Sequence, residues 1–581
     1  MNNNYREITK KKTSFESHIY FSAAALIISP NPLLFLLLVL LLPCFFFKAR
    51  NLLMAPAIST FLLLPLLLFL ASASIHPEYT AAETSPSRSP PPTAPVSGSG
   101  SGVSSGFLST LHSALDQIQK VVGIVSTFSG GVTGGADIGL SSAISDCLDL
   151  LDLSSDELAW TLSTSGDGNA ASNPGTGDHS SDLRSWLSAA LGNQDTCKES
   201  ISSTGSLLAS VVFVSLDSIT SLLSDGLRQL PSGKQAVSGG RRNLQAGFPK
   251  WVGKVERRLL QATGVSPDVT VAKDGSGTFT TVAAAVDAAP EKSDRRYVIY
   301  VKRGIYTENV EININKWNLM IIGDGMNATI ISGSRNVIDG WTTFRSATFA
   351  VSGKGFIARD VSMENTAGPA KHQAVALRSD SDLSVFYRCE ISGYQDSLYA
   401  HSLRQFYRDC RISGTVDFIF GNAAAAIQNC QITARLALPD QKNTVTAQGR
   451  KDPNQNTGFV LQFCNFTAAA DLAASGNQTA TPTYLGRPWK EYSKTAILQS
   501  YMGSVIRPEG WLPWNGDFAL TTLDYAEYMN FGPGSGLSGR VKWPGFHAIT
   551  DSSQAANFTV AQFIDGNLWL PSTGVTYTAG L

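Results

Sequence analysis

Two aspartates occupy matching positions in two neighbouring segments of the sequence. Asp396 lies in GYQDSLY, seven residues after Cys389, and Asp417 lies in GTVDFIFG, seven residues after Cys410. If these segments stack on one another, the two carboxyl groups lie too close to ionise together cheaply, and one is shifted toward its neutral form. A neutral acid beside a base or a nucleophile is typical of hydrolytic chemistry. On spacing alone, the alternative is a ladder of aspartates that only caps turns.

The segments that would position these aspartates form a repeat. From Pro267 onward, related β-rich runs recur: YVIYV, LMIIG, FIARDVSM, VFYRCEIS, QFYRDCRIS, AIQNCQIT and VLQFCNFT. We align them, at spacings of 29, 21, 20 and 34 residues, on Asp360, Cys389, Cys410, Cys430 and Cys464. Strand repeats of this length predict a solenoid, here an all-β parallel β-helix over residues 263–581. Coils stacked about 4.8 Å apart suit a disulfide. By spacing alone, Cys389–Cys410 and Cys410–Cys430 are equally good candidates.

Residues 107–229 have a different pattern. Four segments have apolar residues at i, i+3 and i+4 spacing, and clusters of Gly, Ser and Asp separate them. Four amphipathic helices with short connections predict an α-helical bundle. Cys147 and Cys197 fall on the second and third helices, where they are candidates for a disulfide in a secreted protein. We find no catalytic constellation in this part of the sequence.

Residues 1–75 form a hydrophobic leader rather than part of a fold. Proline interrupts both of its apolar runs, so neither reaches the roughly 20 uninterrupted apolar residues of a spanning helix. The stretch Met54–Ala73 has the features of a secretory signal. We therefore expect secretion, with transient anchoring through the apolar runs or an uncleaved signal anchor as the alternative, and translation could start at Met54.

Two segments of biased composition flank the helical region. Residues 76–106 are rich in Ser, Pro and Gly and are expected to be a linker. Residues 230–262 are a basic junction that contains two Arg-Arg pairs, one of them Arg257-Arg258. Paired arginines in an exposed stretch suit a processing protease, and a solvated charge run is the alternative.

Composition limits the classes of function. The chain has 45 Lys+Arg against 46 Asp+Glu, which disfavours a strongly basic nucleic-acid binder and an acidic disordered protein. The absence of a CxxC pair and of HExxH argues against a zinc site. The long groove of a β-helix suits an extended polymer, and neutral charge with a leader favours a polysaccharide. Four NxS/T sites fit a secreted chain; they are Asn327, Asn465, Asn477 and Asn557.

Five segments resemble the signature blocks of pectin methylesterases and occur in that family's order. They are GIYTE at 304–308, QAVAL at 373–377, GYQDSLY at 393–399, GTVDFIFG at 414–421 and LGRPW at 485–489. One departure is Ser397, where the family usually has Thr. The resemblance covers roughly Pro267 to the C-terminus. It implies a right-handed β-helix that hydrolyses the methyl esters of pectin, and it favours Cys410–Cys430 as the disulfide.

The segment WLSAALGNQDTC, residues 186–197, resembles the pectin methylesterase inhibitor family. Such a domain is commonly the pro-region of plant pectin methylesterases. The family usually has an earlier Cys pair on an N-terminal helical hairpin, and here no Cys lies between Cys44 and Cys147. The hairpin is therefore lost or replaced by the linker, which leaves the inhibitory competence of the region open.

The resemblance implies a role for each candidate residue of the site. Asp417 would attack the ester carbonyl as a nucleophile, and Asp396 would act first as an acid and then as a base. Gln373 and Gln395 would donate hydrogen bonds to the developing oxyanion, and Arg487 would hold Asp417 ionised. The resemblance implies substrate contacts for a partly overlapping set: Thr343, Gln373, Arg487 and Trp489. It implies no metal and no organic cofactor.

We therefore expect a secreted pectinesterase of the cell wall that converts methylated homogalacturonan into pectate and methanol. The expected partners are pectin, a proteinaceous inhibitor and a protease that cuts at Arg257/Arg258, with membrane contact only through the leader. One alternative is a β-helix glycoside hydrolase that uses the same two aspartates. The other is a catalytically inactive wall-binding or inhibitor protein. Two glutamine donors suit acyl chemistry better than an oxocarbenium ion.

Overall fold

The computed structural model describes residues 104–129, 138–165, 175–231, 266–475 and 481–581, and residues 99–581 form one compact unit. Several expectations therefore lie outside the described residues. They are the leader 1–75, almost all of the linker 76–106, nearly all of the junction 230–262 with Arg257 and Arg258, and the glycosylation site Asn477. Asn327, Asn465 and Asn557 are exposed, as glycosylation requires, and their occupancy remains a prediction.

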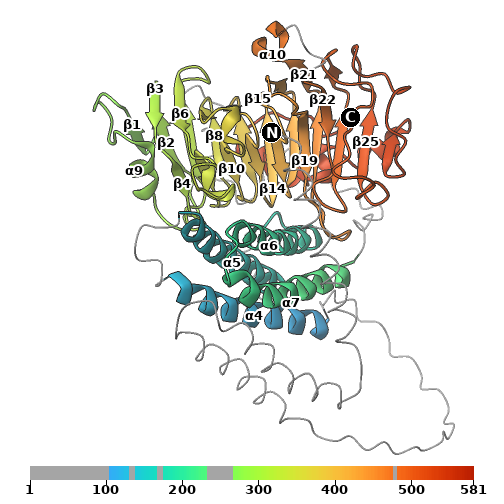
Figure 1. Cartoon of the computed structure of the whole chain (residues 1–581). Coiled ribbons are helices and arrows are strands. Elements are labelled where there is room, and N and C mark those ends of the chain that lie inside the picture. The colour runs from blue at the N-terminus through green and yellow to red at the C-terminus, as the bar shows by residue number, and fades with distance from the viewer. Residues whose placement is uncertain (1–103, 130–137, 166–174, 232–265, 476–480) are drawn as a thin grey trace, which may run out of the picture. The chain divides into compact units, whose positions relative to one another are not determined.

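Four helices form a bundle in the region where the sequence predicts one (Figure 1). They are α4 (Ser105–Ser129), α5 (Ile138–Ser165), α6 (His179–Ser202) and α7 (Leu208–Gln229). Their apolar stripes are buried against one another because a helix with a 3.6-residue apolar period can hide only one face. A disulfide joins Cys147 on α5 to Cys197 on α6, so this prediction is confirmed.

Among the described residues, α7 is the one helix that is long and apolar enough to span a membrane. One face of α7 is buried in the bundle, through residues that include Leu208, Val212, Leu216 and Leu223. The apolar character of α7 is therefore accounted for in part by the packing of the bundle.

The remainder of the described chain is a solenoid of three parallel sheets (Figure 1). The 11-stranded sheet contains β1 (Val269–Val271), β2 (Tyr297–Val301), β5 (Leu319–Gly323), β8 (Ile357–Arg359), β11 (Ser384–Tyr387), β14 (Arg404–Arg408), β17 (Ala424–Gln428), β20 (Gly458–Gln462), β23 (Lys494–Leu498), β25 (Asp524–Tyr528) and β26 (Phe546–Ala548). The 8-stranded sheet contains β3 (Gly304–Thr307), β6 (Thr329–Gly333), β9 (Ser362–Asn365), β12 (Glu390–Ser392), β15 (Arg411–Gly414), β18 (Gln431–Ala434), β21 (Asn465–Ala468) and β24 (Tyr501–Met502).

The third sheet is the one that positions the site. This 7-stranded sheet contains β4 (Val310–Ile312), β7 (Phe349–Val351), β10 (Leu377–Ser379), β13 (Leu398–Ala400), β16 (Ile419–Gly421), β19 (Asn443–Gln448) and β22 (Thr483–Gly486). Short helices accompany the solenoid: α9 (Val282–Asp287), η2 (Phe344–Ser346), η3 (Pro369–Lys371), α10 (Ala470–Ala474), α11 (Ser552–Ala556), α12 (Val560–Phe563), α13 (Gly566–Trp569) and η4 (Leu570–Thr573). The predicted fold class, a parallel β-helix preceded by a helical bundle, is confirmed.

Several successive coils turn from the 11-stranded to the 8-stranded sheet through a residue with left-handed backbone. This residue is Arg388, Asp409 or Asn429 in three successive coils, and Asp360 in the coil before them. The strand register pairs Tyr387 with Arg359, so the residue that corresponds to Cys389 is Val361. The sequence alignment at Asp360 was therefore wrong by one residue, because a polar turn residue was matched to the buried position that follows it.

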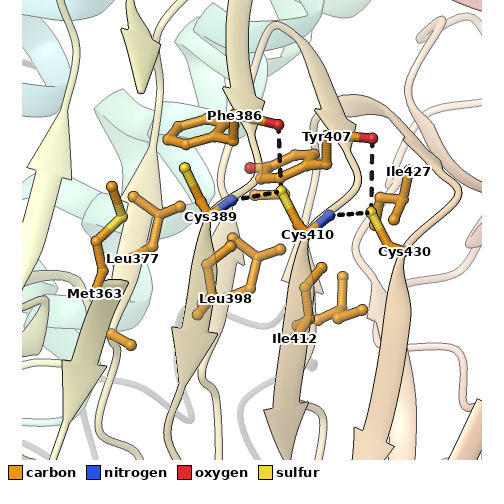
Figure 2. Packing of buried hydrophobic residues seen from close by; sticks show 14 of the residues in the cluster. Met363, Leu377, Phe386, Cys389, Leu398, Tyr407, Cys410, Ile412, Ile427 and Cys430 are labelled. Carbon is orange, nitrogen blue, oxygen red and sulfur yellow. Dashed lines mark hydrogen bonds between the residues drawn. The ribbon is translucent and has the colours of Figure 1, made fainter. Parts of the chain in front are cut away.

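The cysteines of the repeat form an internal stack, and the predicted Cys410–Cys430 disulfide is wrong: both residues are free thiols, as are Cys389 and Cys464. Figure 2 shows that the sulfur atoms point the same way on successive coils. The Cys430 sulfur lies 3.3 Å from the Cys410 amide nitrogen, which donates to it. In-register stacking directs each thiol toward the backbone of the coil before it, so similar spacing along the chain does not bring two sulfur atoms together for a bond.

The bundle packs on the outer face of the 7-stranded sheet. Strand register aligns Ala350, Arg378, Tyr399 and Phe420 in one row across neighbouring strands. Ala350, Tyr399 and Phe420 share a buried cluster with the apolar residues of the helices. The bundle and the sheet therefore have a common apolar interface.

A buried arginine also joins the two parts. Arg404 at the start of β14 is 1% exposed, and its guanidinium donates to Asp182 of α6 at 2.6 Å and to Asp382 of the solenoid at 2.6 Å. The indole N–H of Trp186 on α6 donates to Asp382 as well, at 3.1 Å. Removing one partner from such a group leaves buried charges without compensation.

We expect Arg404→Ala to lower the free energy of unfolding by about 3–5 kcal/mol, because it leaves two buried carboxylates unpaired. Thermal or denaturant unfolding of the full chain measures this loss. The matched control is Arg411→Ala, since the Arg411 side chain is 48% exposed and lies 3.9 Å from its acidic partner. An unfolding midpoint for Arg404→Ala that equals the control would contradict the structural importance of this contact.

Candidate active site

Asp396 and Asp417 occupy equivalent turns on adjacent coils, as the sequence spacing predicts. The register pairs Leu398 with Ile419, so each aspartate lies two residues before the paired position of its strand. The amide of Asp396 donates to the carbonyl of Val416 at 3.1 Å. Both aspartates have left-handed backbone, with φ of 64° and 50°, which Asp tolerates better than most residues. The two residues are each 7% exposed.

The turn at Asp417 depends on a close approach between the coils. A Cβ atom at Gly414 would lie 2.3 Å from the Cβ of Phe418 and 2.6 Å from the hydroxyl of Ser397 on the neighbouring coil. Glycine is therefore required at this position. The Ser397 hydroxyl instead donates to the carbonyl of Tyr394 at 3.1 Å and closes the turn that contains Asp396.

Asp417 is fixed by two residues that contact both of its carboxylate oxygens. Arg487 donates from Nε to Oδ1 at 2.8 Å and from a terminal nitrogen to Oδ2 at 2.7 Å. The hydroxyl of Thr444, which is fully buried, donates to Oδ1 at 2.6 Å and accepts from the backbone amide of Asp417 at 2.8 Å. Oδ1 therefore accepts two hydrogen bonds and Oδ2 accepts one from these residues. Such charge-assisted bonds favour the ionised carboxylate.

Asp396 has the opposite electrostatic environment. Burial raises the pKa of Asp396 well above its usual value, and the neighbouring charge of Asp417 raises it further, against a smaller lowering by Arg487. The two carboxyls on adjacent coils thus have unequal surroundings, because only Asp417 has the arginine as a hydrogen-bond partner. Unequal environments of two neighbouring carboxyls are what distinct acid and nucleophile roles require.

The structure brings every predicted catalytic and substrate-contact residue to one cavity of about 390 Å³. Its lining includes Thr343, Gln373, Gln395, Asp396, Asp417, Arg487 and Trp489. Gln395 and Asp396 share the cavity because they lie in a turn rather than in a strand, where consecutive side chains would point to opposite faces. Thr343 directly precedes η2. In the part of the chain that the structure describes, no hydrogen bond from a protein group to the side-chain amides of Gln373 or Gln395 is found.

Aromatic rings form one wall of the cavity. Tyr399 stacks on Phe420 at 4.1 Å between ring centroids, and Phe420 meets Trp489 edge-on at 5.9 Å. Trp514 lines the cavity as well and stacks on the guanidinium of Arg487 at 4.4 Å. Aromatic faces of this kind suit the flat apolar faces of sugar rings.

The helical bundle also contributes to the lining of the cavity. Four residues of α6 and of the turn after it line the cavity, namely Thr196, Glu199, Ser200 and Ser203. Thr196 also contacts the buried His401 of the solenoid, 2.9 Å from Nε2, and burial lowers the pKa of His401 to about 4. Neither His401 nor His372 is among the residues that line the cavity.

Sequence reasoning missed three contributions to the site. Thr444 has no motif around it, although its position one coil beyond Asp417 could have suggested a contact. Trp514 lies in a loop after the last recognised block. The α6 residues belong to a region with no catalytic pattern in its sequence. They reach the cavity because the bundle packs against the solenoid.

Comparison with known protein families agrees with this geometry. Residues 268–567 match the family model described as pectinesterase, and residues 84–229 match the model described as plant invertase/pectin methylesterase inhibitor. These matches cover the solenoid and the helical bundle, respectively.

Individual relatives agree as well. The chain is 61% identical over 474 residues to pectinesterase/pectinesterase inhibitor PPE8B of Prunus persica, covering 81% of this chain and 89% of the relative. It is 54% identical to probable pectinesterase/pectinesterase inhibitor 44 of Arabidopsis thaliana, covering 82% and 93%. Among solved structures, the pectin methylesterase from carrot has 57% identity and a TM-score of 0.54, and it covers 55% of this chain and 100% of its own.

We expect Asp396→Asn to stabilise the fold increasingly as the pH rises above about 4. Below the pKa of the unfolded carboxyl, both states are protonated and the substitution gains nothing. Above it, the unfolded state ionises while folded Asp396 stays neutral, so the native aspartate costs up to about 1.4 kcal/mol per pH unit until its raised pKa is reached. Asparagine removes this cost.

Denaturant unfolding of both proteins at several pH values between 4 and 7 measures the difference. The matched control is Asp409→Asn, because Asp409 has the same left-handed backbone but a side chain that is 29% exposed. A stability gain for Asp396→Asn that stays constant or falls with rising pH would show that the carboxyl is not held neutral by its surroundings.

Proposed function

The chain belongs to the pectinesterase family and is a carboxylic ester hydrolase, and on that premise we propose how its residues hydrolyse the methyl esters of pectin. The observation that carries the proposal is the unequal pairing of two adjacent carboxyls. Asp417 accepts two hydrogen bonds from Arg487, and Asp396 is buried with a raised pKa. Asp417 is the nucleophile and Asp396 is the proton donor.

The first half-reaction forms a covalent intermediate. A carboxylate oxygen of Asp417 attacks the ester carbonyl carbon, and the electrons of the carbonyl double bond move to its oxygen. Oδ2 is the attacking atom, because it accepts one hydrogen bond from the surrounding residues whereas Oδ1 accepts two. When the tetrahedral intermediate collapses, the bond to the methoxy oxygen breaks and Asp396 supplies its proton, so methanol leaves and an acyl anhydride on Asp417 remains.

The second half-reaction restores the enzyme. Asp396, now a carboxylate, removes a proton from water as the water oxygen attacks the acyl carbon. The bond from that carbon to Asp417 breaks, which releases the free carboxyl of the polymer and returns Asp417 to its ionised form. At most one of the two aspartates is ionised at any step, because the negative charge lies on the substrate oxygen in both tetrahedral intermediates.

Gln373 and Gln395 stabilise the oxyanion of both tetrahedral intermediates. Their presence in the cavity, without a hydrogen bond to another protein group among the described residues, supports this role. A preorganised donor of this kind contributes about 2.7–4 kcal/mol to the transition state. Thr343 and the rings of Tyr399, Phe420 and Trp489 contact the sugar residues on either side.

Chemical outcome separates this mechanism from the alternatives. A glycoside hydrolase with two carboxylates would create new reducing ends. A wall-binding protein would release no methanol and create no reducing ends. Incubation with methylated pectin, followed by measurement of methanol, released acid and reducing ends, discriminates the three. The amide pair and the arginine on Asp417 support ester hydrolysis over attack at an anomeric carbon.

The bundle is a pro-region whose removal opens the cavity to the polymer. The contribution of α6 to the cavity wall supports this view, as does the match of residues 84–229 to an inhibitor family. The leader directs the protein to the cell wall, where plant relatives of this kind are expected to act, and a protease separates the two parts at Arg257-Arg258.

We expect Asp417→Ala to abolish methanol release, by many orders of magnitude, because the covalent nucleophile is lost. Binding of pectin should persist, since the aromatic wall is unchanged. The matched control is Asp409→Ala, an aspartate with the same left-handed turn conformation outside the cavity. If Asp417→Ala kept more than about a tenth of wild-type turnover, the role of nucleophile would belong to another residue.

We expect the wall-extracted protein to begin near Leu259. N-terminal sequencing of material from plant tissue measures the start, and Arg257→Ala/Arg258→Ala should block the cut. The pair Arg241→Ala/Arg242→Ala is the matched control, because it changes the other Arg-Arg pair of the junction. A mature protein that begins near Ser74 would mean that the bundle stays attached.

A further inference from the structure

Two lysines beside the cavity are paired with carboxylates of the bundle. Lys490 forms an ion pair with Glu199, and Lys451 forms one with Asp195 at 2.5 Å. Both acids lie on α6, four residues apart, and therefore on the same face of the helix. In the described ranges of the chain, no other carboxylate lies within ion-pair distance of either lysine.

This pairing differs from the other ionic contacts between the bundle and the solenoid. Arg345 contacts Asp146 of α5 at 3.0 Å, but Glu311 of the solenoid lies 3.3 Å from the same guanidinium. Arg404 likewise has Asp382 of the solenoid as a second partner, as described above. The two arginines are therefore partly neutralised without the bundle, whereas Lys451 and Lys490 depend on the bundle for their carboxylates.

Both lysines lie close in sequence or in space to Trp489, which lines the cavity. Lys490 follows Trp489 directly, and its ammonium lies 5.0 Å from the centroid of that ring. Lys451 lies on the neighbouring coil, where a Cβ on Gly449 would meet the Trp489 ring at 2.8 Å. Strands β19 and β22, which lead into these two segments, pair as far as Thr446 and Gly486, where the backbones are about 4.8 Å apart. Glu199, the partner of Lys490, itself lines the cavity.

We propose that Lys451 and Lys490 form a subsite for unesterified carboxylates of galacturonan, next to the reacting ester on the Trp489 side. The carboxylates of Asp195 and Glu199 occupy this subsite while the bundle is in place. Trp489 provides the face on which a sugar ring stacks, and the ammonium groups bind the uronate carboxylates. This inference rests on the proposed function, because its ligand is the hydrolysed part of the same polymer.

The subsite has a consequence for the pattern of hydrolysis. A sugar that has lost its methyl group binds on the Trp489 side better than a methylated one, and it places its neighbour at the carboxyl pair. The enzyme should therefore prefer esters next to units that are already hydrolysed, and it should produce runs of free carboxylates rather than scattered ones.

The test uses residues 259–581, which contain a complete core of their own and correspond to the whole chain of the carrot enzyme. The probe is an unesterified galacturonate octamer, and its affinity is measured by calorimetry at low ionic strength. Lys451→Gln/Lys490→Gln should bind it roughly 3-fold to 30-fold more weakly than wild type, the effect of losing two partly exposed ion pairs. Added salt should weaken wild-type binding more than binding by the double variant.

A matched control is Lys302→Gln, because Lys302 follows β2 of the 11-stranded sheet, far from the carboxyl pair along the solenoid. It should bind the octamer as wild type does. In turnover, the double variant should lose the preference for partly hydrolysed over fully methylated pectin, seen as a fall in the ratio of the two kcat/KM values.

Three results would decide the question. Octamer affinity equal to wild type in the double variant would overturn the inference and leave the proposed function intact. An equal loss of kcat/KM on both pectins, with octamer binding retained, would also overturn it, since the lysines would then serve the reaction in general. If wild type released no methanol but octamer binding still depended on the lysines, the subsite would stand and the proposed function would fail.

Discussion

The ion pair between Arg487 and Asp417 is the interaction on which the rest of the site depends. Arg487 donates two hydrogen bonds to Asp417 and none to Asp396, the other carboxyl of the stacked pair. Without this asymmetry, the two acids would share a proton without defined roles. With it, the two carboxyls have different surroundings: Asp417 is held by the arginine, whereas burial and the neighbouring negative charge both raise the pKa of Asp396. In the proposed mechanism, at most one of the two aspartates is ionised at any step, so no step requires two adjacent carboxylates.

The repeat of the solenoid places the two aspartates next to each other. Adjacent coils have the same turn at the same offset, so one left-handed aspartate lies over another, and the β-helix core holds the coils in register. Tyr399 and Phe420 are neighbours on the face of the 7-stranded sheet that packs against the helical bundle, and both are buried there. In the proposed function, the bundle and the polymer therefore use one surface.

Much of the fold and of the site could be predicted from the sequence, and the failures have physical causes. The seven-residue offset from Cys389 and Cys410 predicted the stacked aspartates, because register in a solenoid follows from the repeat. Thr444 was missed since a single hydroxyl one coil away has no pattern in sequence. The Cys410–Cys430 bond was wrong, because equal spacing indicates adjacency of backbones but not the direction of the sulfur atoms. The contacts of α6 with the cavity depend on how the bundle packs against the solenoid, and no local sequence motif encodes that packing.

The central claim is that Asp396 is neutral while Asp417 is ionised. Infrared difference spectroscopy near pH 6 on the wild type, Asp396→Asn and Asp417→Asn tests it most directly, because a protonated carboxyl has a carbonyl band that a carboxylate lacks. We expect the wild type to show a protonated-carboxyl band that disappears in Asp396→Asn and persists in Asp417→Asn. Buried Glu157, whose pKa burial also raises well above its usual value, should contribute a band that all three proteins share. A band that disappeared in Asp417→Asn and persisted in Asp396→Asn would place the proton on the wrong residue and contradict the assignment of acid and nucleophile.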